Sequence, residues 1–168
     1  SRTEIDVIFD QYKLFFKRPV NEKNSVNMAF TNSNRGWGAS KSEQVNKNYN
    51  PDFKEIYDCG PEIDFDHEFK TLPYYAKNIW PNDMPELKKI AINFYNKCNK
   101  VGIKILEKIA KNLDLPEYYF SDKFDLPMGL LRCNFYPEKP KNTKINDFGI
   151  APHSDYGCLT LLFTEGDP

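Results

Sequence analysis

Apolar side chains recur at spacings of three and four residues between Thr3 and Arg18. The positions are Ile5, Ile8, Phe9, Tyr12, Phe15 and Phe16. This spacing places them on one face of an amphipathic helix, which Pro19 would end. We therefore predict a helix from Thr3 to Arg18 whose aromatic stripe packs in the core.

A second and longer apolar stripe follows Asp83 and continues to about Leu113. Its members are Leu87, Ile90, Phe94, Cys98, Val101, Ile105 and Ile109. Asp83 and Glu86 have the spacing of a capping box, so we predict that a long helix begins there. The opposite face is rich in lysine, which indicates a solvated surface. A short further helix is expected from Tyr118 to Phe120.

The apolar period changes to two after Asp125, as is typical of a strand. Met128, Leu130, Arg132 and Asn134 would share one face, with Gly129, Leu131, Cys133 and Phe135 on the other. Two further strands are expected, in 51–58 and in the apolar run that begins at Leu159 and ends at Phe163. The glycines around Trp37 predict a turn that folds the indole ring onto the body of the protein.

Composition narrows the class of protein. The 168 residues suffice for one domain, and 40% hydrophobic with 15% aromatic residues favours a folded chain. The net charge of −1 gives no basis for nucleic acid as a partner. No apolar run reaches the length of a membrane span, and no signal peptide opens the sequence. Four widely spaced cysteines fit a reducing, cytoplasmic setting.

Candidate chemistry is concentrated in the segment from Asp147 to Thr164. His153 and Asp155 are two residues apart, so in a strand both side chains emerge on the same face and can reach one ion. An imidazole and a carboxylate are two of the three ligands in the facial triad of non-haem Fe(II) oxygenases. A His-x-Asp triplet also arises by chance, and such a pair at a strand end is commonly a surface hydrogen bond. The other histidine, His67, lies in an acidic loop and is expected to be solvated.

The residues around this pair resemble the isopenicillin N synthase-like family of Fe(II)- and 2-oxoglutarate-dependent oxygenases. The likeness rests on Asn134-Phe135-Tyr136-Pro137, then Gly149, His153, Asp155 and Gly157, followed by the run Leu159, Thr160, Leu161 and Leu162. Segments 35–38 and 52–57 are also similar to family segments. Many positions agree in order, so the resemblance is specific.

The resemblance implies an α+β fold: a partial double-stranded β-helix, or jelly roll, with N-terminal helices packed outside. Residues 1–168 would be one incomplete domain, with 1–125 mainly helical and 126–168 forming the first strands of the jelly-roll core. It also implies Fe(II) held by His153 and Asp155, 2-oxoglutarate as co-substrate bound by Asn134 and Tyr136, dioxygen, and a small-molecule substrate. Oligomeric state and substrate identity do not follow.

The chain also departs from the family pattern. The distal histidine and the Arg-x-Ser motif that would anchor 2-oxoglutarate are absent, as is the family's opening strand. We therefore expect an internal piece of a longer enzyme that by itself binds Fe(II) weakly and does not turn over. Two alternatives stay open: an oxidase of the same fold that uses no 2-oxoglutarate, and a noncatalytic jelly-roll binding module.

Overall fold

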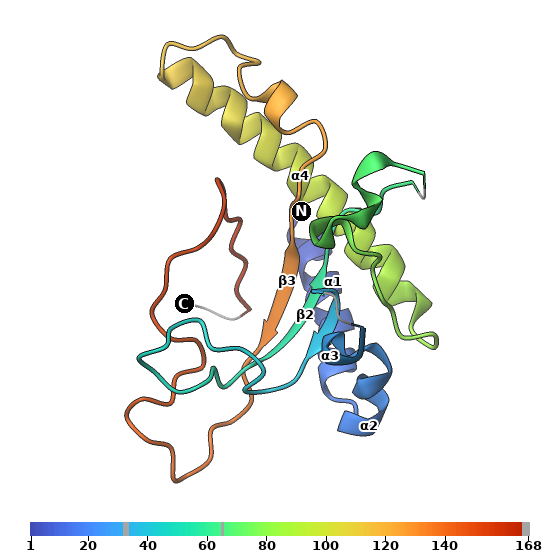
Figure 1. Cartoon of the computed structure of the whole chain (residues 1–168), viewed down its shortest axis with the longest axis vertical. Helices are drawn as coiled ribbons and strands as arrows, with labels where there is room; N and C mark the ends of the chain where they lie inside the picture. Colours follow the sequence, from blue (N-terminus) through green and yellow to red (C-terminus); the bar gives the residue numbers. More distant parts are fainter. Residues whose placement is uncertain (32–33, 65, 166–168) are drawn as a thin grey trace.

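A small antiparallel sheet and two long helices organise the computed structural model, which describes residues 1–31, 34–64 and 66–165. The helices are α1 (Arg2–Phe16), α2 (Val20–Lys23), α3 (Met28–Thr31) and α4 (Pro85–Asn112). The 3₁₀ helices are η1 (Asn24–Val26), η2 (Glu68–Thr71), η3 (Pro73–Tyr75) and η4 (Ser121–Lys123). The strands are β1 (Gly36–Gly38), β2 (Glu55–Cys59) and β3 (Leu131–Phe135), in spatial order β1-β2-β3 (Figure 1). The described residues thus have the predicted α+β composition.

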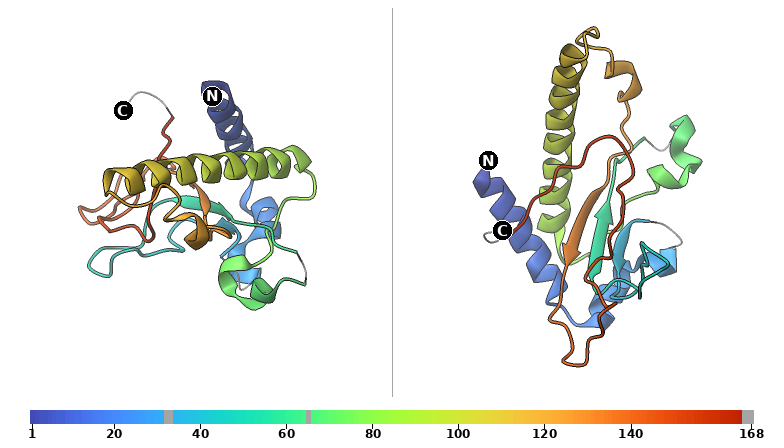
Figure 2. Two further views of the ribbon diagram at one scale, coloured as in Figure 1. Left: turned by 90° about the horizontal axis from the view of Figure 1, so that it is seen from above. Right: turned by 90° about the vertical axis from the view of Figure 1, so that its left-hand side faces the viewer.

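One face of the sheet carries the core. Trp37 lies opposite Tyr57, which lies opposite Cys133, so these three side chains point to the same side. Helices α1 and α4 cover that side, as the right-hand view of Figure 2 shows. The buried core residues are Ile8, Tyr12, Phe15, Phe16, Val26, Trp37, Tyr57, Cys59, Leu87, Ala91 and Phe94. The predicted aromatic stripe of the first helix is therefore confirmed as core at Tyr12, Phe15 and Phe16, whereas Phe9 is half-buried and lies outside this cluster. The packing of Trp37 is confirmed as well.

Gly36 makes the approach of β1 to the preceding segment possible. Its φ is +98°, and a Cβ at this position would lie 2.3 Å from the carbonyl oxygen of Val26. Only glycine combines that backbone conformation with so close a contact. The result is that Trp37 is carried into the core from a strand of only three residues.

The helix boundaries agree with the sequence patterns, but the predicted cap of the long helix is wrong. Helix α4 begins at Pro85 after Met84, whose side chain makes no capping hydrogen bond. Asp83 instead accepts hydrogen bonds from the guanidinium group of Arg18, beyond the end of α1. The predicted short helix at residues 118–120 is also displaced, because these residues form turns and the 3₁₀ helix η4 follows them.

Strand β3 has the predicted faces. Leu131, Cys133 and Phe135 pack against the core, while Arg132 and Asn134 lie on the exposed side. The strand expected over 51–58 is present as β2, shifted toward its C-terminal end. The first 125 residues therefore supply two of the three strands as well as the long helices.

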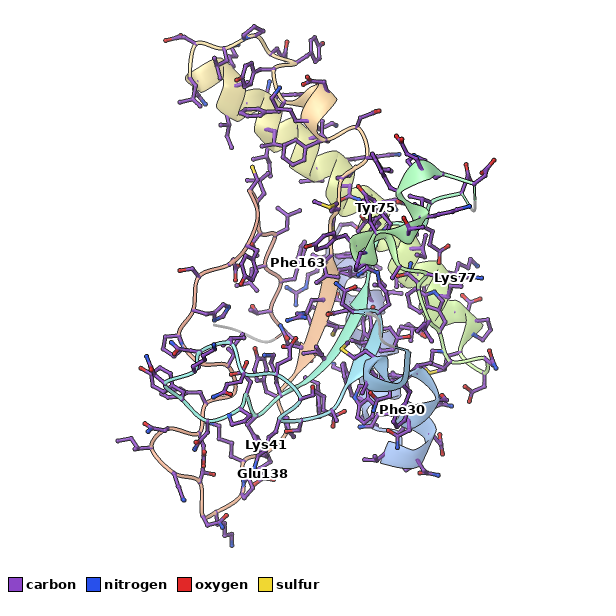
Figure 3. All side chains as sticks on the ribbon, in the orientation of Figure 1. Phe30, Lys41, Tyr75, Lys77, Glu138 and Phe163 are labelled. Carbon is purple, nitrogen blue, oxygen red and sulfur yellow. The ribbon has the colours of Figure 1, made fainter. Side chains whose placement is uncertain are left out.

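The strand expected from Leu159 to Phe163, and the strand expected to present His153 and Asp155, are wrong for the described residues, where 147–165 is irregular chain. A strand needs a neighbour to pair its N–H and C=O groups, and no described residue forms a ladder with this segment. Leu162 remains 80% exposed and Thr160 is exposed, so neither is in a strand core. Phe163, labelled in Figure 3, contacts Phe94 of α4 with ring centroids 5.4 Å apart.

Candidate metal centre

The side chains of His153 and Asp155 converge although their segment is not a strand. His153 Nε2 lies 3.2 Å from Asp155 Oδ1. The His153 side chain is 30% exposed and that of Asp155 58% exposed, so solvent and ions can reach both. The structure thus brings together the two residues that the sequence singled out as metal ligands.

A hydrogen bond to the backbone sets the chemical state of the imidazole. His153 Nδ1 lies 2.8 Å from the carbonyl oxygen of Ala151, which can only accept, so Nδ1 carries the proton of this bond. In the neutral imidazole Nε2 then presents a lone pair. This is how metal-ligating histidines are commonly oriented, with the far nitrogen donating to a carbonyl or carboxylate.

Two acceptors that face each other at 3.2 Å need a positive charge between them. A proton on Nε2 satisfies this requirement and makes an ion pair. A divalent metal satisfies it as well, since an imidazole nitrogen and a carboxylate oxygen are the donor types of non-haem Fe(II) sites. The donor set therefore fits a divalent ion. Among the described residues, no cluster of three His, Cys, Asp or Glu side chains completes a site.

The second carboxylate oxygen of Asp155 also has a partner. Thr160 Oγ1 donates a hydrogen bond of 3.0 Å to Asp155 Oδ2, leaving Oδ1 directed at His153. Each candidate ligand is thus oriented by one neighbour, Ala151 for the imidazole and Thr160 for the carboxylate. Such supporting contacts tune ligand orientation and basicity.

The segment that carries His153 is held by the loop before β2. Figure 1 shows the two running side by side next to the sheet. Phe53 N donates to Phe148 O at 2.8 Å, and the side chain of Asn46 donates to Pro152 O at 3.1 Å. Because these contacts lie on both sides of Gly149, they fix the path of the chain that leads to His153.

The candidate co-substrate residues lie close to this segment but differ in environment. A Cβ at Gly149 would be 2.8 Å from Tyr136 Cδ1, so the backbone packs directly on the tyrosine ring. Burial, followed by the charge of Asp52, raises the pKa of Tyr136, so its hydroxyl stays a proton donor at neutral pH. Asn134 lies opposite Ile56 in the ladder and is exposed. Of the two, the structure brings Tyr136 against the His153 segment.

His67 has a local structural role. Its Nδ1 accepts a hydrogen bond from Phe69 N at 3.1 Å and caps η2. The expected loop position is confirmed, but the side chain is half-buried and was expected to be solvated.

One functional neighbour was not expected from the sequence. Asp52 is 1% exposed, and its Oδ1 accepts from Ala151 N at 3.1 Å. The available signal was Asp52 and Lys54, two charged residues on one side of a short strand-like stretch. Their partners lie far along the chain, so the pattern did not predict the contact.

Comparisons with known proteins agree on one class. Residues 1–83 match the family described as non-haem dioxygenase in morphine synthesis, N-terminal. The 2-oxoglutarate-Fe(II) type oxidoreductase hxnY of Emericella nidulans is 29% identical over 170 residues, covering 94% of this chain and 47% of that protein. The chain thus spans about half the length of the curated relatives it matches.

Solved structures give the same picture. A Caulobacter crescentus protein assigned to the 2OG-Fe(II) oxygenase family has a TM-score of 0.71 and 29% identity, over 84% of this chain and 46% of that one. A full-length Neurospora crassa protein solved in complex with alpha-KG has a TM-score of 0.65 and 27% identity, over 87% of this chain and 45% of that one. These likenesses support the broad 2-oxoglutarate oxygenase superfamily and do not single out the isopenicillin N synthase-like family within it. Among the described residues, no helix is both long enough and apolar enough to cross a membrane.

Proposed function

We propose that these residues are part of a longer Fe(II)- and 2-oxoglutarate-dependent oxygenase that oxidises a small organic molecule. The observation that carries the proposal is the convergence of His153 Nε2 and Asp155 Oδ1 at 3.2 Å, with Nδ1 bonded to Ala151. The named relatives and the solved structures support the same class. The share of each relative that is covered supports a longer parent protein.

His153 and Asp155 would hold the iron, with a third ligand outside the described residues. Bound Fe(II), with 2-oxoglutarate as co-substrate, supplies the activation of dioxygen for oxidation of the substrate. The residues of this chain hold and orient the two metal ligands. Ala151 and Thr160 fix the two ligands, and the loop before β2 fixes the segment that carries them.

Tyr136 and Asn134 are proposed to bind 2-oxoglutarate. The Tyr136 hydroxyl is a neutral donor with a raised pKa, which suits a carboxylate or keto oxygen as acceptor. Its ring is set by the backbone at Gly149, four residues before His153. Asn134 lies two residues earlier on the exposed side of β3, so its amide is available to a ligand.

The finer parts of the proposal follow from the resemblance in the sequence. They are membership of the isopenicillin N synthase-like family, a jelly-roll core completed by further strands, one domain spanning 1–168 and beyond, and hydroxylation or desaturation as the reaction. β3 is an edge strand in the order β1-β2-β3, and its outer edge has no strand partner among the described residues, which supports the addition of further strands. Four free cysteines support a cytoplasmic location.

The test is co-substrate turnover by the full-length protein. With Fe(II), 2-oxoglutarate and dioxygen we expect succinate to form, and we expect His153→Ala and Asp155→Ala each to abolish it. Ser154→Ala is the matched control and should retain turnover. Substrate oxidation without succinate formation would favour the oxidase that uses no 2-oxoglutarate. If the wild-type protein neither oxidised a substrate nor formed succinate, the noncatalytic binding module would be favoured. Succinate formation by residues 1–168 alone would contradict the expected need for further ligands.

A further inference from the structure

A chain of five charged side chains connects the sheet to the His153 segment. Asp58 and Arg132 face each other across β2 and β3, and Arg132 Nε and Nη2 bind the two Asp58 oxygens at 2.9 and 2.6 Å. Arg132 also contacts Glu43 at 3.0 and 3.1 Å. Glu43 Oε2 lies 3.1 Å from Lys54 Nζ, which donates to Asp52 Oδ2 at 2.6 Å. We call Asp58, Arg132, Glu43, Lys54 and Asp52 the ion-pair chain.

Most side chains of the ion-pair chain are buried. The side chains of Asp52, Lys54 and Asp58 are each 1% exposed. Buried charges are retained only where their partners are well placed, so these contacts have little freedom to rearrange. The carboxylate of Asp52 therefore has a position fixed relative to β2 and β3.

The Asp52 oxygen that does not contact Lys54 connects Asp52 to the candidate metal ligand His153 through Ala151. Asp52 Oδ1 accepts a hydrogen bond from Ala151 N at 3.1 Å. The carbonyl oxygen of Ala151 in turn accepts a hydrogen bond from His153 Nδ1 at 2.8 Å. Ala151 is itself 1% exposed. The His153 ring is thus two hydrogen bonds away from a buried carboxylate. No described residue forms a strand ladder with this segment, so such contacts locate it.

We propose that Asp52 is a positioning residue that fixes the backbone at Ala151 and, through it, the orientation of the His153 imidazole. Its significance for metal binding rests on the proposed function. Lys54 holds Asp52, and the rest of the ion-pair chain connects these two residues to β2 and β3. Asp52 touches neither metal nor co-substrate in this account.

The test compares two double variants that both remove the buried ion pair. Asp52→Asn with Lys54→Met keeps an amide oxygen that can accept from Ala151 N. Asp52→Ala with Lys54→Met removes the acceptor. Replacing both partners avoids an unpaired buried lysine, which would by itself unfold the region. Lys23→Met with Glu55→Gln is the matched control, because it removes both charges of another buried ion pair, Lys23–Glu55, at 2.7 Å.

Two readouts are measured in the full-length protein: hydrogen exchange of the Ala151 amide, and the affinity for Fe(II) without turnover. We expect the alanine double variant to exchange this amide at least roughly tenfold faster than the asparagine double variant, in line with local opening. We expect its Fe(II) affinity to fall about 10- to 100-fold, the usual cost of losing a contact that orients a ligand. The control with Lys23→Met and Glu55→Gln should change neither.

Equal Ala151 exchange and equal Fe(II) affinity in the two double variants would overturn the proposal. A wild-type protein that binds no Fe(II) would refute the proposed function, while the exchange measurement would still decide whether Asp52 fixes Ala151. If the alanine double variant does not fold, Asp52→Ser with Lys54→Met takes its place, because the shorter hydroxyl does not reach Ala151 N.

Discussion

Gly149 and Tyr136 are in direct contact, so close that a Cβ on residue 149 would lie 2.8 Å from Tyr136 Cδ1 and 3.0 Å from Cε1. The ring is half exposed, so it can turn away if a side chain is added. We expect Gly149→Ala to shift the tyrosine without unfolding the protein. If Tyr136 binds 2-oxoglutarate, the apparent KM of Gly149→Ala for 2-oxoglutarate should be roughly tenfold above that of the wild-type protein, since small displacements at a binding site are costly.

The measurement is succinate formation by the full-length protein against 2-oxoglutarate concentration. Gly157→Ala is a useful comparison, because a Cβ there meets nothing within 4 Å, although its positive φ adds strain. An unchanged KM in Gly149→Ala would separate Tyr136 from co-substrate binding.

The buried ion pair between Lys23 and Glu55 should make the protein sensitive to the loss of one partner. Lys23 Nζ lies 2.7 Å from Glu55 Oε2, and Trp37 Nε1 donates to the same oxygen at 2.7 Å. Lys23→Met leaves a buried carboxylate with one neutral partner, so we expect a loss of about 3 kcal/mol in the free energy of unfolding. Adding Glu55→Gln should recover much of it, because no charge is then left unpaired.

Urea unfolding measures both effects. The control is Lys97→Met, which breaks the exposed pair with Glu4 and should cost less than about 1 kcal/mol. Equal losses in Lys23→Met and Lys97→Met would refute the stabilising role of burial at Lys23.

Adjacent residues of α1 should differ sharply in their effect on folding. Phe15 is 0% exposed and packs edge-on against Tyr57 with centroids 4.8 Å apart, whereas Leu14 is 57% exposed. Phe15→Ala should lower the free energy of unfolding by about 3–5 kcal/mol through lost burial and a cavity. Leu14→Ala should change it by no more than about 0.5 kcal/mol. Similar urea midpoints for Phe15→Ala and Leu14→Ala would contradict the burial of the Phe15 face of α1.

The buried thiols should resist alkylation. Burial raises the pKa of both Cys59 and Cys133 to about 12, so at pH 8 they remain protonated in the folded protein. Iodoacetamide should modify exposed Cys158 first, and Cys59 and Cys133 only after unfolding, as mass spectrometry of peptides would show. Because folding raises these pKa values, their contribution to stability is present at neutral pH and is lost as the pH rises toward 12. Rapid labelling of Cys59 in the folded protein would contradict its burial.

The sequence predicted those parts of the fold that depend on local periodicity. The stripe of α1, the first half of the α4 stripe and the alternation in β3 each record one buried face, so position along the chain was enough. In the second half of α4 the prediction is wrong, because Val101 is 48% exposed and Leu106 and Ala110 are buried instead. The Asp83 cap failed because Arg18, 65 residues away, competes for the same carboxylate. Such a partner leaves no periodic signal.

The candidate site was predictable in its residues but not in its scaffold. His153 and Asp155 were identified from their spacing, yet irregular chain rather than a strand brings them together. What holds that segment is Asp52, 99 residues before Ala151. The lysine behind Asp52 contacts Glu43, which Arg132 binds from 89 residues away. Long-range pairs of this kind depend on the folded backbone, which the sequence pattern alone does not supply.

Equilibrium binding of Fe(II) to the full-length protein, measured without oxygen, tests the convergence of His153 and Asp155 most directly. We expect His153→Ala and Asp155→Ala each to lower the affinity by at least about 100-fold, because each removes a ligand, and Ser154→Ala between them to leave it unchanged. Wild-type affinity in either ligand variant would show that the 3.2 Å pair is an ordinary ion pair and would contradict the assignment as an iron-dependent oxygenase.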